Sequence, residues 1–179
     1  MQCAQTIQMW ASWERRWTQE EILSAVINLE HAGDIIANNL LEFAAKRTRR
    51  GGSFAPEELD VIAAMHAELV DSLRLGLTVF LRGDAALRDA QRLVARKRLL
   101  RRREAEAAAL NIRSLQAAAS GPETVTTRVD NGDLLRIVRD LRRVHSHIAA
   151  LAYPVLERAA ENEGRDAGPA PAATRALSE

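Results

Sequence analysis

The chain has 179 residues, which suits one domain with a substantial core. Lys and Arg total 25 against 24 Asp and Glu, so the formal net charge is only +1, and binding to nucleic acid through bulk charge is excluded. The single cysteine, Cys3, excludes an internal disulfide and suits a reducing compartment. No apolar run approaches the ~20 residues that a membrane-spanning helix needs, and no signal peptide opens the chain. We therefore expect a cytoplasmic protein.

Turn-forming residues are few, and the segments between them are rich in Ala, Leu, Arg and Glu, which favour helices. We expect an all-α antiparallel bundle in residues 18–162, preceded by a Trp-containing segment, 1–17, and followed by a disordered tail, 163–179. The expected helices lie near 18–50, 56–82, 85–119 and 124–162. Thr18 and Glu21 form a capping-box pattern.

Trp10, Trp13 and Trp17 recur at i, i+3 and i+7 in the N-terminal segment. A short helix with a tryptophan edge suits a membrane interface or a partner surface, so these residues are candidate contacts. We favour packing of the same edge over an uncovered part of the bundle.

The first helix carries a stripe with alternating steps of four and three, typical of a helix packed in a bundle. Its members are Ile22, Val26, Leu29, Gly33, Ile36, Leu40 and Phe43. Because glycine within a helix costs about 1 kcal/mol relative to alanine, Gly33 indicates a close approach of a neighbouring helix or ligand.

Glu30, Asp34 and Asn38 lie beside this stripe, each four residues from the next. On a helix this spacing stacks three oxygen-bearing side chains on one face, as a hard or borderline metal ion requires. They are the candidate metal ligands. The alternative is solvation of the two carboxylates or their pairing with arginines.

The third helix contains seven basic residues and no acid between Arg92 and Arg103. Its candidate contacts with anionic lipid or an acidic partner are Arg96, Lys97, Arg101 and Arg102. We favour a solvated face balanced by nearby acids. The run has no interleaved aromatic residues, which argues against stacking on bases.

The last helix repeats the step pattern of the first, 112 positions later, which suggests an internal repeat. Its members are Leu134, Val138, Leu141, His145, Ile148, Ala152 and Val155. We expect His145 to be a packed core histidine, and we do not expect His147 to bind metal.

Residues 27–36, INLEHAGDII, resemble the signature helix of PhoU domains, with its Glu-x-x-x-Asp motif and an asparagine one turn later. Residues 139–148 and 152–156 resemble the last helix of the subtype found at the cytoplasmic C-terminus of bacterial sodium/phosphate cotransporters. The resemblance implies two tandem three-helix bundles, of which this chain has about four of six helices. It also implies a metal site on Glu30 and Asp34.

The second PhoU motif falls on Arg142 and Ser146, with Ala150 at the asparagine position. Since neither carboxylate is present, we expect the second metal site to be lost.

The function that this resemblance implies is a regulatory or accessory domain of phosphate uptake, at the inner face of the cell membrane. It would contact a phosphate transporter or phosphate-signalling protein and bind an iron, zinc, manganese or magnesium ion. Motifs for di-iron, zinc-protease, nucleotide or serine-hydrolase chemistry are missing from the sequence, so we do not expect an enzyme. The alternative is a metal-free helical interaction or membrane-surface module. An incomplete bundle also favours a homodimer.

Overall fold

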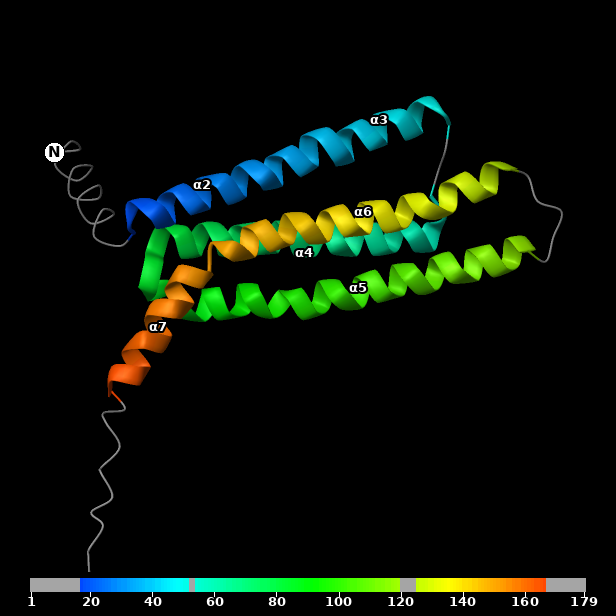
Figure 1. The fold of residues 1–179 in the computed structure, drawn as a ribbon. Coiled ribbons are helices and arrows are strands. Elements are labelled where there is room, and N and C mark those ends of the chain that lie inside the picture. Colours follow the sequence, from blue (N-terminus) through cyan, green and yellow to red (C-terminus); the bar gives the residue numbers. More distant parts are fainter. Residues whose placement is uncertain (1–16, 52–53, 120–124, 167–179) are drawn as a thin grey trace, which may run out of the picture.

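The computed structural model describes residues 17–51, 54–119 and 125–166, which are helical and contain no strand (Figure 1). The all-α prediction is confirmed. The elements are α2 (Gln19–Asp34), the π-helix η1 (Ile35–Leu41), α3 (Glu42–Arg49), α4 (Pro56–Arg82), the 3₁₀ turn η2 (Gly83–Ala86), α5 (Leu87–Ala119), α6 (Val125–Ala150) and α7 (Tyr153–Asp166).

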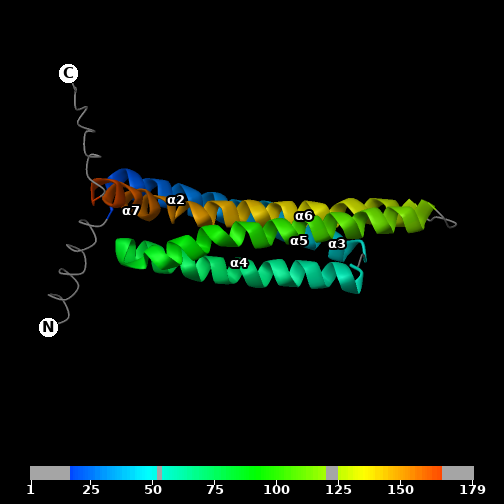
Figure 2. The same cartoon turned by 90° about the horizontal axis from the view of Figure 1, so that it is seen from below.

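The long helices run up and down beside one another as an elongated bundle (Figures 1 and 2). Helices α4, α5 and α6 pack on each other, and the rod formed by α2, η1 and α3 lies along α6. Helix α7 turns away from the axis of α6 and packs near the start of α5.

The helix ends follow their sequence signals. The Thr18 hydroxyl accepts from the Glu21 N–H at 3.2 Å, and the Glu21 carboxylate accepts from the Thr18 N–H at 2.7 Å, completing the expected capping box. Gly83 ends α4 with φ +58°, a left-handed conformation that favours glycine.

Two helices predicted as uninterrupted are not. The predicted helix at 124–162 breaks at Leu151 and Ala152, where the chain turns between α6 and α7. Pro154 explains this break, because it lacks an N–H and its ring would clash with the carbonyl of Ala150 in a continued helix. The predicted helix at 18–50 keeps its length but contains the π-helical segment η1. Wider turns in η1 change the angular spacing on which the expected stacking of Asn38 over Asp34 depends.

Helix α6 contributes the largest share of the core, as the predicted stripe indicates. Its most buried members are Leu134, Val138, Leu141, Val144, His145 and Ile148. They meet buried residues of α4 and α5 that include Met65, Val79, Leu93 and Leu100.

The predicted stripe of α2 is only half right. Ala25, Ala32 and Ile35 are the buried apolar residues of this rod, whereas Val26 is 53% exposed and Ile36 is 40% exposed. The stripe is therefore turned partly away from α6. A side-chain carbon added to Gly33 would meet nothing within 4 Å, so the expected close approach at Gly33 is wrong.

Close approach of two helices occurs at Gly76 on α4 instead. A carbon added there would lie 3.0 Å from Ile148 and 3.1 Å from Leu151. Gly76 therefore allows α4 to pack tightly on the end of α6.

An apolar groove separates the α2–η1–α3 rod from α4, with α6 as its floor. One section, of about 380 Å³, lies between Leu29, Gly33 and Ile36 on one side and Leu69 and Leu73 on the other. A second section, of about 680 Å³, continues toward Phe43 on α3 and Phe54, which lies just before α4. Gly33 and Ile36, two exposed members of the predicted stripe, line this groove.

The buried His145 predicts that the fold loses stability in acid. Burial, with a smaller effect of the neighbouring Arg96 and Lys97 charges, lowers the pKa of His145 from 6.5 to about 4, against a hydrogen bond to the Leu93 backbone that raises it. Its Nε2 has no hydrogen-bond partner among the described residues. Since the unfolded chain takes up this proton first, stability falls as the pH drops from about 6.5 to about 4.

The expected loss from this one group is up to about 3 kcal/mol. Urea unfolding of the wild type and of His145→Leu across this pH range measures this loss. The free energy of unfolding should fall less steeply with decreasing pH in the variant. Equal slopes would contradict the assignment.

Candidate functional site

A polar notch lies between the α2–η1 rod and α6, on the far side of α2 from the apolar groove. It has a volume of about 480 Å³. Its polar lining residues are His31, Asp34, Asn38, Asn39, Arg143 and His147. Residues from two helices thus meet beside the π-helical segment. Short π-helical segments are often found at functional sites.

His147 is oriented by a residue on the facing helix. Its Nδ1 lies 3.1 Å from the Oδ1 of Asn28, whose amide nitrogen donates to the Ser24 carbonyl at 2.8 Å. Because that Oδ1 can only accept, Nδ1 carries the hydrogen and Nε2 keeps its lone pair. The His31 ring meets the His147 ring edge to face, with centroids 5.2 Å apart.

Burial and the charges around the notch disfavour protonation of His147. Burial lowers its pKa first, and the nearby His31 and Arg143 lower it further. His147 is therefore neutral at pH 7, the state in which an imidazole can bind a metal or accept a hydrogen bond.

The structure separates the three predicted metal ligands. Asp34 and Asn38 line the notch, while Glu30 is exposed and is not among its lining residues. In the part of the chain that the structure describes, no three His, Cys, Asp or Glu side chains come together as a metal-binding group. Metal binding by Glu30, Asp34 and Asn38 stays a prediction.

The sequence did not predict three residues that line this notch, His31, Asn39 and Arg143, nor Asn28, which orients His147. His31 lies inside the recognised motif, yet its pairing with His147, 116 positions later, depends on how α2 and α6 pack. Spacing along one helix gives no signal for such a pair.

The second motif position contains no carboxylate that replaces the missing ones. Arg142 pairs with Glu104 of α5 at 3.5 Å, and the Ser146 hydroxyl donates to the carbonyl of Arg142 at 3.1 Å. Asp140 is buried and pairs with Arg143 at 3.5 Å.

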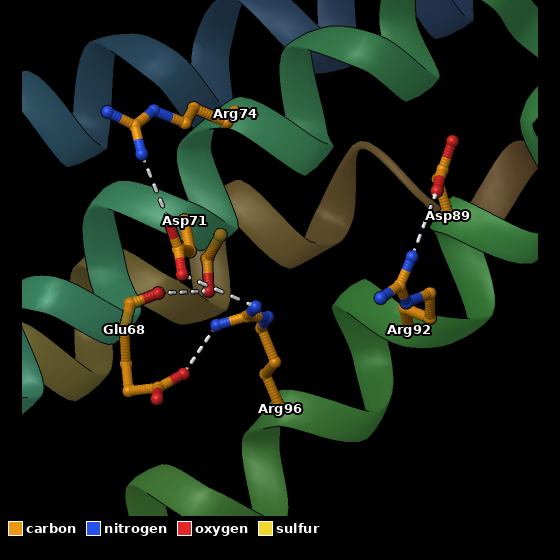
Figure 3. A network of polar contacts seen from close by, with 7 residues as sticks. Glu68, Asp71, Arg74, Asp89, Arg92 and Arg96 are labelled. Atoms are coloured by element: carbon orange, nitrogen blue, oxygen red, sulfur yellow. Dashed lines mark hydrogen bonds and ion pairs between the residues drawn. The ribbon is translucent and has the colours of Figure 1, made fainter.

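Part of the basic run on α5 is held by ion pairs (Figure 3). Arg96 pairs with Glu68 and lies 3.6 Å from Asp71 on α4, and Arg92 lies 3.9 Å from Asp89. These contacts match the favoured interpretation for those two arginines. Arg96 is thus tied to the bundle, whereas Lys97, Arg101 and Arg102 are exposed.

Trp17 is a core residue, which corrects its prediction as a membrane or partner contact. It is 5% exposed, its Nε1 donates to the Phe80 carbonyl at 3.0 Å, and the two rings lie 5.5 Å apart. Packing against α4 buries it. Trp10 and Trp13 lie outside the described residues.

Among the described helices, none is long and apolar enough to cross a membrane.

The chain is similar to proteins named "Putative inorganic phosphate export protein YjbB". It is 32% identical over 153 residues to those of Escherichia coli strains K12 and O157:H7, and 32% identical over 152 residues to that of Salmonella typhimurium. The matches cover 85% and 84% of this chain but only 26% of each relative, so the chain spans about a quarter of the length of these proteins. No protein-family model and no solved structure matches it. The chain is therefore related to proteins named for phosphate export.

Proposed function

We propose that this chain is a PhoU-like accessory domain of phosphate transport that acts through contact with a membrane transporter or a phosphate-signalling protein. The observation that carries the proposal is the 32% identity, over 85% of the chain, to relatives named for phosphate export. The motif-level resemblance to the domain of sodium/phosphate cotransporters supports the same role.

The structure favours contact over catalysis. The polar notch is open, and its polar lining consists of one carboxylate, two histidines, two amides and an arginine. His147 is already oriented by Asn28. The exposed basic residues Lys97, Arg101 and Arg102 offer a second surface, suited to an acidic partner or anionic lipid headgroups.

Metal binding is part of the proposal. Asp34 and Asn38 supply oxygen donors at the notch, and Glu30 lies one helical turn before Asp34 on the exposed side of α2. An oxygen-rich set of this kind suits iron, manganese, magnesium or zinc. A bound cation would offset the repulsion between two carboxylates four residues apart, which costs a few tenths of a kcal/mol.

Phosphate flux tests the proposed role. In a bacterial strain that lacks the chain, release of preloaded radioactive phosphate should differ from wild type, and the wild-type chain should restore it. Glu30→Ala/Asp34→Ala, at equal protein abundance, should leave the flux at the level of the deletion strain. The matched control, Glu161→Ala/Glu163→Ala, removes two exposed carboxylates from α7 and should restore the flux.

Flux that does not depend on the chain at all would contradict the proposed role. If both double variants restore the flux, the proposed role stands, but Glu30 and Asp34 do not contribute to it.

Metal content tests the ligand assignment separately. Elemental mass spectrometry of tag-free protein should find a stoichiometric metal in the wild type and in Glu161→Ala/Glu163→Ala, and none in Glu30→Ala/Asp34→Ala. Circular dichroism should show unchanged helicity in all three. Equal metal retention in the Glu30/Asp34 variant would refute the site.

A further inference from the structure

The solvent-facing side of α5 carries cations that the acids of this helix do not neutralise. Each acid on α5 already contacts an arginine: Asp89 lies 3.9 Å from Arg92, Glu104 lies 3.5 Å from Arg142, and Glu106 lies 2.8 Å from Arg103. Four exposed cations in the middle of α5 have no ion pair with a described residue: Lys97, Arg98, Arg101 and Arg102. This side of α5 therefore keeps a local excess of positive charge, although the net charge of the chain is only +1.

The exposed side of α6 extends the same positive surface. Helices α5 and α6 run side by side in both views (Figures 1 and 2). The contact of Arg142 with Glu104 joins their exposed sides, and Arg139 is exposed one helical turn before Arg142. We call the surface formed by Lys97, Arg98, Arg101, Arg102 and Arg139 the α5–α6 face.

The same side of α5 continues into exposed aliphatic side chains. Successive positions in steps of three and four share one side of a helix, and such a row contains Arg98, Arg101, Ala105, Ala108, Ile112 and Leu115. Ile112 is 54% exposed and Leu115 is 45% exposed. Cations beside exposed aliphatic side chains are suited to the boundary between lipid headgroups and acyl chains.

The α5–α6 face lies apart from the cavities of the bundle. The apolar groove and the polar notch are formed by the rod, α4 and α6, and no residue of α5 lines either of them. From Lys97 to Ile112, the exposed side of α5 extends about 22 Å along the helix axis. Cations spread over such a length without a pocket fit a flat, diffuse negative surface, which anionic lipid headgroups provide.

We infer that the α5–α6 face binds the surface of an anionic membrane. The inference rests on the contact role proposed above and names the partner of its basic surface. Each lysine or arginine held near an anionic bilayer strengthens binding about fivefold, and salt weakens this attraction by screening. Ile112 and Leu115 then contact the boundary between headgroups and acyl chains.

Co-sedimentation of the full chain with lipid vesicles tests the inference. The wild type should sediment with vesicles of phosphatidylcholine and phosphatidylglycerol in equal amounts, and it should stay in solution with phosphatidylcholine alone. Arg98→Gln/Arg101→Gln/Arg102→Gln should bind the anionic vesicles about a hundredfold more weakly. The matched control, Arg49→Gln/Arg50→Gln/Arg82→Gln, removes the same charge at the ends of α3 and α4 and should bind like the wild type.

A fluorescent probe tests which side of the bundle meets the membrane. Ala105→Cys on α5 and Ala67→Cys on α4, both at exposed positions, are made in a Cys3→Ser background and labelled with an environment-sensitive fluorophore. Anionic vesicles should shift the emission of the label at position 105 to shorter wavelength. The emission of the label at position 67 should stay unchanged.

Equal weakening by the two triple variants, or equal emission shifts at the two positions, would overturn the inference. Capture of the wild type by polyglutamate, without binding to the anionic vesicles, would assign the face to an acidic protein and overturn it as well. Circular dichroism of each variant confirms that it is folded before binding is compared. Because vesicle binding is measured separately from phosphate flux, loss of this inference leaves the proposed phosphate role standing.

Discussion

The structure depends on the apolar stripe of α6. This helix packs against α2, α4 and α5, and its buried residues Leu134, Val138 and Leu141 form the centre of the core. Each fully buried aliphatic side chain stabilises the fold by roughly 1.5–3 kcal/mol, so the stripe is a large part of the driving force. The tight contact of Gly76 with Ile148 and the buried His145 are consequences of the same packing.

The arrangement leaves α2 with apolar surface that α6 alone cannot cover. Ala25, Ala32 and Ile35 pack inward, while Ile36 lines the groove and Val26 is exposed. A helix that is apolar on more than one side is normally covered on more than one side. The opposite side of the rod carries Asp34 and Asn38, so the rod separates an apolar groove from a polar notch.

The sequence predicts the parts of this fold that depend on local signals. Thr18 with Glu21 and the left-handed Gly83 identify helix ends because caps and glycine conformations act within a few residues. Pro154 carried a local signal as well, and the break that it causes could have been predicted.

The parts of the fold that depend on packing between helices could not be predicted from the sequence. The spacing of apolar residues in α2 predicts that its stripe is buried. This spacing cannot distinguish a stripe that faces α6 from one that faces a groove. The π-helical turns of η1 have no simple sequence signature. Contacts such as His147 with Asn28, or Arg96 with Glu68, require knowing which helices are neighbours.

The central claim is that the buried apolar stripe of α6 holds the bundle together. Hydrogen–deuterium exchange of the wild type, of Val138→Ala and of Val26→Ala measures this directly, because Val138 is fully buried on α6 and Val26 is exposed on α2. Val138→Ala should exchange faster at amides of α4, α5 and α6, since the core loses a buried side chain, and Val26→Ala should exchange like the wild type. Exchange in Val138→Ala that equals that of the wild type would contradict the claim.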